Sequence, residues 1–273
     1  MLTVGSLFSG IGGLDLGLEQ AGMKTVWQVE FDDWARGKLD ENFPHTEKFK
    51  DVREVGKHNL RPVDLICGGF PCQDLSSAKR NAQGLEGEKS GLWFEYFRII
   101  CELRPRYVLI ENVTTLVNGG LDRVLSCLAS VGYDAEWQVL RAISFGLPHH
   151  RQRVFIIAYP SRVQCKLSQS KTRDSNQIMY SKTGHFRFRH PPTVYIDDLK
   201  RPVVEIPEHL RMDNGIPFEF SEIEAAIKGY GNAVCPPVAK WIGERIIEFD
   251  IAISHAPLAM PSTDGILDIK SRK

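Results

Sequence analysis

The stretch "LFSGIGGLDLGLEQAG", residues 7–22, joins two different hydrophobic patterns through a glycine-rich turn. Residues 3–8 have the composition of a buried strand, and residues 13–22 have the apolar spacing of a helix. Glycines at 10, 12 and 13 would let the backbone approach a ligand closely, with helix N–H groups directed at it. A glycine turn between strand and helix is often only a turn, so this pattern needs support from elsewhere in the chain.

The alternation of strand and helix patterns continues to residue 159. Further strands are predicted at 25–31, 63–69, 107–113, 137–143 and 153–159, and further amphipathic helices at 33–43, 91–103 and 120–131. This order predicts an α/β fold of the Rossmann kind, a doubly wound and mostly parallel sheet. Binding sites in such sheets collect at the carboxyl ends of the strands, and we expect every unusual stretch to follow a strand.

The pattern changes after Tyr159. Residues 160–225 are rich in Ser, Gln, Lys, Arg and Pro and predict a small, loop-rich insertion. Helical spacing returns at 222–228 and 236–249, so the main domain is expected to comprise 1–159 plus 226–250. Residues 251–273 are expected to form a flexible tail.

Composition excludes several classes of protein. The chain has 273 residues, 42% hydrophobic and 25% charged, and its apolar runs are too short to span a membrane. We see no signal-peptide pattern at the N-terminus and expect a reducing, cytoplasmic location. The six cysteines show neither Cys-x-x-Cys nor finger-like spacing, so neither a metal site nor a disulfide framework is expected.

Acidic and aromatic residues support the interpretation that the glycine turn binds a ligand. Glu30 ends the second predicted strand, 18 residues after Gly12, where a carboxylate can accept hydrogen bonds from ribose hydroxyls. Phe31 could stack on an adenine ring, and Asp51 could accept from an adenine amino group. A nucleoside-containing cofactor is favoured, with NAD and S-adenosylmethionine as the alternatives.

Three further stretches carry reactive groups: "GGFPCQ" at 68–73, "ENV" at 111–113 and "HHRQRV" at 149–154. A proline before Cys72 would present the thiol to a cleft at a strand end. Glu111 ends a strand that is otherwise apolar. Arg151 and Arg153 alternate along a strand start, so both guanidinium groups could point the same way.

With these motifs in order, the sequence resembles the cytosine-C5 DNA methyltransferase family. The resemblance rests on "FSGIGG", "VEFDDWA", "VDLICGGFPCQDLS", "ENV", "RQRVFIIA" and "GYGNAVCPPVA", which cover most of 1–159 plus 229–249. It implies a Rossmann-like methyltransferase fold, S-adenosylmethionine as cofactor, and residues 160–225 as the target-recognition insertion.

The resemblance also implies a mechanism. The Cys72 thiolate would attack C6 of a flipped-out cytosine, which activates C5 to take the methyl group. Glu111 would hold or protonate ring N3, and Arg153 and Arg151 would position the base and favour the thiolate. These four residues are the expected catalytic set.

Binding residues carry over in the same way. The cofactor pocket is expected to include Phe8, Gly10, Ile11, Gly12, Gly13, Leu14, Glu30, Phe31, Asp51, Val52, Leu92, Asn232 and Val234. Residues 76–88 correspond to a loop that folds over DNA. The expected DNA contacts are Ser76, Lys79 and Arg80 there and Arg187 and Arg189 in the insertion.

The insertion suits a nucleic-acid partner. Residues 162–190 hold seven Lys or Arg against one Asp, with Tyr180, Phe186 and Phe188 between them. A solvated loop is the alternative reading of such a charge run. We expect double-stranded DNA as substrate, a monomer, a prokaryotic or phage origin, and a cognate restriction endonuclease in the same system.

Departures from the family pattern keep two other functions open. His149 stands where the family usually has Gln, no "LQGFP"-like stretch precedes the last motif, and the insertion is short. A tRNA cytosine-C5 methyltransferase shares the same catalytic core, and a catalytically silent DNA-binding relative would share the fold. Incubation with labelled S-adenosylmethionine and either DNA or tRNA discriminates between the three.

Overall fold

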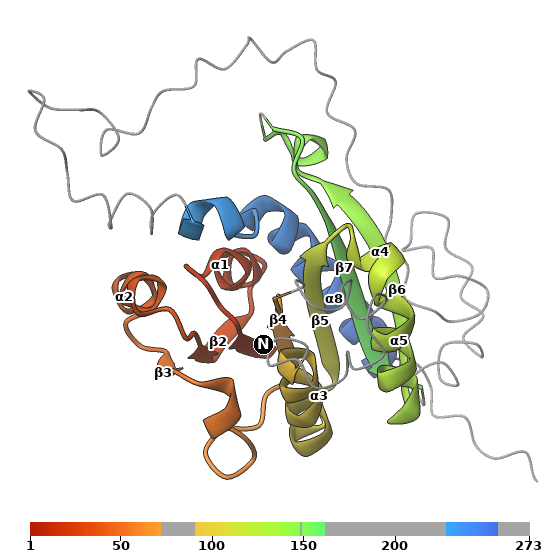
Figure 1. Cartoon of the computed structure of the whole chain (residues 1–273). Helices are drawn as coiled ribbons and strands as arrows, with labels where there is room; N and C mark the ends of the chain where they lie inside the picture. Colours follow the sequence, from red (N-terminus) through yellow and green to blue (C-terminus); the bar gives the residue numbers. More distant parts are fainter. Residues whose placement is uncertain (72–90, 148, 162–227, 256–273) are drawn as a thin grey trace, which may run out of the picture.

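The computed structural model describes residues 1–71, 91–147, 149–161 and 228–255 (Figure 1). Within them lies a seven-stranded sheet of order β3-β2-β1-β4-β5-β7-β6. The strands are β1 (Thr3–Leu7), β2 (Lys24–Val29), β3 (Glu47–Phe49), β4 (Leu65–Gly68), β5 (Tyr107–Val113), β6 (Tyr133–Arg141) and β7 (Gln152–Pro160). The α-helices are α1 (Gly13–Gln20), α2 (Asp33–Asn42), α3 (Gly91–Leu103), α4 (Leu116–Gly119), α5 (Leu121–Ser130) and α8 (Pro236–His255). Two 3₁₀ turns, η1 (Val52–Glu54) and η3 (Ala142–Phe145), complete the elements.

The prediction of a mostly parallel, doubly wound sheet is confirmed. β3, β2, β1, β4 and β5 pair in parallel, whereas β7 is antiparallel to both of its neighbours. The expectation that every unusual stretch follows a strand is wrong for "HHRQRV", because these residues follow η3 and lead into β7. Since β7 runs in the opposite direction, its start lies at the same edge as the carboxyl ends of the parallel strands.

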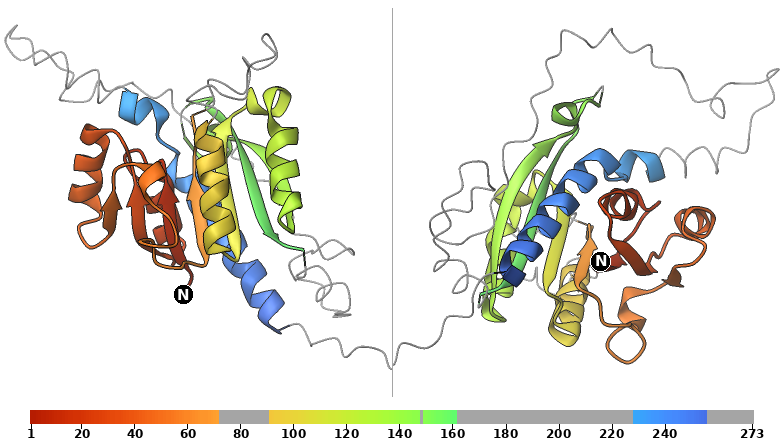
Figure 2. Two further views of the ribbon diagram at one scale, coloured as in Figure 1. Left: turned by 60° about the horizontal axis from the view of Figure 1, so that its bottom comes forward. Right: turned by 180° about the vertical axis from the view of Figure 1, so that it is seen from behind.

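Helices cover both faces of the sheet (Figure 2). On one face, Trp93, Tyr96 and Ile99 of α3 and Val124 and Leu128 of α5 belong to one buried cluster with Ile66, Val108 and Ile110. On the other face, Leu14 and Leu18 of α1 and Val238, Ile242, Ile246 and Phe249 of α8 pack with Leu65, Leu109 and Ile157. Burial of this apolar area is the main stabilising contribution to the fold.

Glycines set the distance between α1 and α8. A Cβ at Gly17 would overlap Ala239 Cβ and the Pro236 carbonyl, and one at Gly243 would lie 2.8 Å from Ala21 Cβ. The two helices can therefore lie against each other only because both positions lack a side chain.

Two boundaries differ by more than two residues from the sequence prediction. α8 continues to His255, so residues 251–255, assigned to the tail, are helical; Phe249 and Ile253 extend the apolar spacing of the helix. β6 begins at Tyr133 rather than at 137, because an edge strand tolerates the charged side chains of Asp134 and Glu136. Predictions for 72–90, 162–227 and 256–273 lie outside the described residues. No helix in the described part of the chain has the length and apolar character needed to cross a membrane.

Candidate active site at the carboxyl edge of the sheet

The glycine turn between β1 and α1 has a backbone that glycine makes possible. Gly10 and Gly12 have φ of 56° and 84°, in the left-handed region, and Phe8 shares it with φ of 54°. A Cβ at Gly10 would meet no atom within 4 Å, so the turn is open to a ligand there. At Gly13 an added Cβ would instead overlap the Val234 carbonyl, so this glycine serves the packing of the chain that returns before α8.

Glu30 ties the end of β2 to this turn. Its Oε2 accepts a hydrogen bond from the Gly10 N–H (2.7 Å) and its Oε1 accepts one from the Asp32 N–H (2.8 Å). A carboxylate offers about four acceptor positions, so two such bonds leave Glu30 able to accept from a ligand as well. Phe31 beside it keeps 63% of its surface exposed, and the Lys50 ammonium lies over its ring, 5.8 Å from the centroid.

The other expected cofactor residues divide into two groups. Asp51 holds Arg53 through its backbone N–H (2.9 Å) and its guanidinium (2.6 Å), and hydrogen bonding to Arg53 lowers the Asp51 pKa. Its carboxylate is therefore engaged by its own neighbour. Leu14 and Val52 are buried in the two core clusters, and Leu92 packs against one of them, so the side chains of these three residues contribute to the core.

The chain that returns before α8 closes the other side of the turn. Residues 228–232 are helical, and Lys228 forms an ion pair with Asp32 (3.1 Å). A Cβ at Gly229 would overlap the Trp34 ring and lie 3.3 Å from Ile11. Asn232 and Val234 follow directly, so residues from both ends of the chain meet around one site.

Glu111 and Arg153 form an ion pair at the ends of β5 and β7. Glu111 stands opposite Phe155 in the ladder, which makes Arg153 its diagonal neighbour on the same face. Arg153 Nε lies 3.0 Å from Glu111 Oε1, but the angle is not that of a hydrogen bond, and Oε1 has no hydrogen-bond partner among the described residues. Burial raises the pKa of Glu111 to about 7, against the lowering effect of Arg153 and Arg151.

The segment after β4 reaches this carboxylate. A Cβ at Gly69 would lie 2.6 Å from Glu111 Oε2, so only glycine lets the two strand ends approach this closely. The Asn112 amide donates from Nδ2 to the Phe70 carbonyl (2.9 Å) and accepts from the Val113 N–H (2.8 Å). Residues 68–71 are thus fixed beside Glu111. Asn112 was not among the expected site residues, although its place in "ENV" next to Glu111 was a signal.

Cys72 itself lies outside the described residues, as do the expected DNA contacts Ser76, Lys79, Arg80, Arg187 and Arg189. The structure brings three features together: the chain immediately before Cys72, the Glu111 carboxylate and the Arg153 guanidinium. Among the described residues no group of three His, Cys, Asp or Glu side chains could hold a metal ion.

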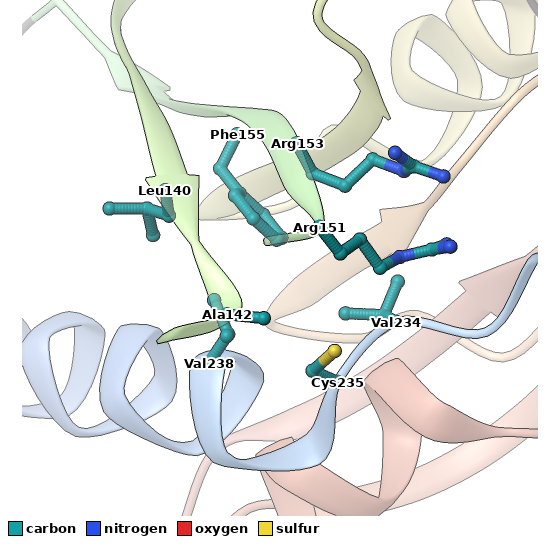
Figure 3. Close-up of a pocket in the computed structure, with 8 residues that line it drawn as sticks. All are labelled: Leu140, Ala142, Arg151, Arg153, Phe155, Val234, Cys235 and Val238. Atoms are coloured by element: carbon teal, nitrogen blue, oxygen red, sulfur yellow. The ribbon is translucent and has the colours of Figure 1, made fainter. Parts of the chain in front are cut away.

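Arg151 and Arg153 extend in the same direction from the start of β7 (Figure 3). They line a small hollow whose other residues are Leu140, Ala142, Phe155, Val234, Cys235 and Val238. Arg151 donates from Nη1 to the Gly231 carbonyl and from Nη2 to the Asn232 carbonyl (2.8 Å). Cys235 is half-buried, with its Sγ 3.9 Å from His149 Nε2, and burial raises the pKa of its thiol. Sequence reasoning did not connect Cys235 with the site.

Comparisons with known proteins found several methyltransferases similar to this chain. The type II methyltransferase M.Bsp6I of Bacillus sp. (strain RFL6) is 39% identical over 206 residues, 73% of this chain and 60% of that protein. A solved Escherichia coli prophage protein assigned as a DNA modification methyltransferase is 28% identical, with a TM-score of 0.50 over 60% of this chain and 48% of its own. The fold is also that of a Spodoptera frugiperda DNMT2 mutant, with 22% identity and a TM-score of 0.53 over 64% of this chain and 54% of its own.

The chain spans about half the length of the curated relatives it matches. A family model described as C-5 cytosine-specific DNA methylase matches residues 2–214, which include the glycine turn, Glu30, Glu111 and the arginine pair. The chain belongs to the C-5 cytosine-specific DNA methylase family.

Proposed function

We propose that the chain transfers a methyl group from S-adenosylmethionine to C5 of a cytosine in double-stranded DNA, through a covalent bond between Cys72 and C6. One observation carries this proposal. A buried carboxylate, Glu111, pairs with Arg153 at the sheet edge and contacts the short segment that leads into Cys72. Family membership supports the same reaction.

The residues around the glycine turn fit the cofactor. Open space at Gly10 lets a nucleoside approach the protein backbone closely. The accepting carboxylate of Glu30 suits its ribose, and the exposed ring of Phe31 suits its adenine. Asn232 and Val234 would bound the site from the opposite side. Asp51 could reach an adenine amino group once Arg53, which is mostly exposed, moves aside. The bound cofactor would supply an electrophilic methyl group on its sulfonium.

The chain's own residues would act on the base. The Cys72 thiolate would donate an electron pair to C6, and the C5–C6 π electrons would move toward C5 while N3 takes a proton or hydrogen bond from Glu111. A Glu111 pKa of about 7 keeps a substantial protonated fraction near neutral pH. After C5 is methylated, its proton leaves to a base, the C5–C6 double bond reforms, and Cys72 departs with the electron pair of the C6–S bond. N3 returns its proton to Glu111 in the same stage, which leaves a neutral 5-methylcytosine.

Arg153 would hold Glu111 and the base in register. Its guanidinium already neutralises the carboxylate in part, so Glu111 can release a proton without leaving an isolated buried charge. Since C5 of a paired cytosine lies inside the duplex stack, the target base must be rotated out to reach these groups.

Substrate contact is proposed for the parts outside the described residues. Residues 76–88, with Ser76, Lys79 and Arg80, would close over the DNA, and the insertion 160–225, with Arg187 and Arg189, would contact phosphates and grooves. The proposed domains are 1–159 plus 226–250 for catalysis and 160–225 for target recognition. We also propose a monomeric enzyme of bacterial or phage origin that acts in the cytoplasm beside a cognate endonuclease. Type II methyltransferase relatives from Bacillus support the bacterial origin.

Transfer of tritium from labelled S-adenosylmethionine tests the proposal directly. The purified chain should label duplex DNA and leave tRNA unlabelled. Label found only in tRNA would show that the substrate is tRNA and not DNA. Label in neither nucleic acid would favour a catalytically silent DNA-binding relative. The Cys72→Ala variant should transfer no label yet bind the cofactor nearly as well as the wild type, and residual transfer by this variant would exclude Cys72 as the nucleophile.

A further inference from the structure

Two neighbouring arginines serve different parts of the site. Arg153 lies on Glu111, whereas Arg151 donates to the carbonyls of Gly231 and Asn232 (Figure 3). Within the part of the chain that the structure describes, no carboxylate lies within ion-pair distance of Arg151. Its two donor nitrogens are therefore directed at backbone from a segment 80 residues later in the chain.

The carbonyls that Arg151 binds belong to the end of a helix. Residues 228–232 are helical, and the Gly229 carbonyl accepts from the Ala233 N–H (3.1 Å). The last carbonyls of a helix have no partner inside it, and a cation there is favoured by hydrogen bonding and by the helix dipole. Arg151 thus caps this helix from another element of the fold.

The capped helix stands at the cofactor side of the site. Gly229 packs on Trp34 and Ile11, and the Val234 carbonyl lies against Gly13 at the start of α1. Asn232 lies between these two contacts in the chain, and its carbonyl accepts a hydrogen bond from Arg151. Loss of Arg151 would leave the carbonyls of Gly231 and Asn232 without their partner.

From these contacts we infer that Arg151 is a positioning residue for the cofactor site, which keeps the segment 229–234 against the glycine turn and does not touch the target base. The inference rests on the proposed function, since it takes the ligand to be S-adenosylmethionine. It separates the roles of two arginines that one motif places together: Arg153 works on the base side through Glu111, and Arg151 works on the cofactor side through the helix end.

Cofactor binding without DNA tests this role. Calorimetric titration with S-adenosylhomocysteine, the demethylated product, compares the wild type with Arg151→Met and Arg106→Met. Arg151→Met should raise the Kd about tenfold, as expected for the loss of charged hydrogen bonds. Arg106→Met removes an arginine that pairs with Asp250 of α8 at the opposite edge of the sheet, and it should leave the Kd unchanged.

Kinetics and hydrogen exchange separate positioning from general structure. Arg151→Met should raise the KM for S-adenosylmethionine while kcat at saturating cofactor stays within about twofold of wild type. Amide exchange should accelerate at residues 229–235 and remain unchanged in β4 and β5. If Arg151→Met does not fold, Arg151→Gln, which loses the charge and the reach, is measured in the same way.

Three outcomes are decisive. A raised Kd with a preserved kcat supports the inference. A wild-type Kd for the variant, or a fall in kcat with KM unchanged, overturns it and assigns Arg151 to the base or the DNA. A wild-type protein that binds no S-adenosylhomocysteine overturns the proposed cofactor itself, which is a separate failure.

Discussion

Replacement of Glu111 by Gln isolates the effect of burying this carboxylate. In the folded chain burial raises its pKa to about 7, whereas an ordinary Glu has a value of 4.5. The folded state therefore keeps a proton over a pH range in which the unfolded chain has released it. Between these two values the free energy of unfolding falls as pH rises, and above about 7 the whole penalty for the buried charge is present. Gln carries no titrating proton and removes this dependence.

The magnitude follows from the two pKa values. The raised pKa lowers the free energy of unfolding by about 3 kcal/mol above pH 7, and by less than about 1 kcal/mol at pH 5. Glu111→Gln should therefore gain about 2 to 3 kcal/mol of stability relative to the wild type between pH 5 and pH 8. The attraction of Arg153 for the charged carboxylate is already contained in the Glu111 pKa of about 7, and Asp15, whose pKa burial raises to about 6, titrates in both proteins.

Urea unfolding at the two pH values and constant ionic strength measures this difference. Trp27 and Trp93 are fully buried and report unfolding by fluorescence. Glu102→Gln is the control: burial raises the Glu102 pKa, but its pairing with Arg98 outweighs this and lowers the pKa overall, so no gain with pH is expected. If Glu111→Gln shows the same stability difference from wild type at pH 5 and pH 8, the raised pKa of Glu111 is refuted.

Three further predictions test other parts of the site. Gly13→Ala should cost about 1–3 kcal/mol and weaken cofactor binding, because its Cβ would overlap the Val234 carbonyl; thermal unfolding and calorimetry that both match wild type would contradict this packing. Asn112→Ala should lower kcat by about 10²-fold with cofactor affinity unchanged, since it frees the Phe70 carbonyl and the chain that leads to the nucleophile; a wild-type kcat in the tritium assay would refute that role. The double change Arg187→Ala and Arg189→Ala should weaken DNA binding and reduce its salt dependence by about one logarithmic slope unit per lost phosphate contact; an unchanged slope in fluorescence anisotropy would remove these residues from the interface.

The spacing of apolar residues along the sequence predicted the helices and strands whose limits depend on neighbouring residues. Residues 91–103 and 107–113 have the bounds that their apolar spacing indicated, because one face or both faces of each are buried along their whole length. Glu30 lies at the glycine turn as its distance from Gly12 suggested. Motif order also placed Glu111 and Arg153 near the same edge, although their pairing depends on the reversal of β7, which no residue in that strand encodes.

Contacts between distant segments could not be predicted in this way. The partners of Arg151 arrive 80 residues later, and only the assembled fold shows that they are helix-end carbonyls. Asp51 precedes η1 and accepts a hydrogen bond from the Arg53 N–H. This contact competes with the ligand contact that was expected from the position of Asp51 at a strand end. The depth at which Glu111 lies, and hence its pKa, follows from how the sheet is covered.

The covering of the sheet by α8 has a consequence for biosynthesis. The apolar face formed by Leu65, Leu109 and Ile157 is covered by α1 and α8, so a ribosome has translated all the strands that the structure describes before α8 completes the cover. At ordinary elongation rates the interval from the end of β7 to the end of α8 is on the order of 5 to 20 s. During that time the nascent sheet exposes a hydrophobic surface beside an incomplete cofactor site. A chain stopped after β7 should therefore associate with chaperones or aggregate.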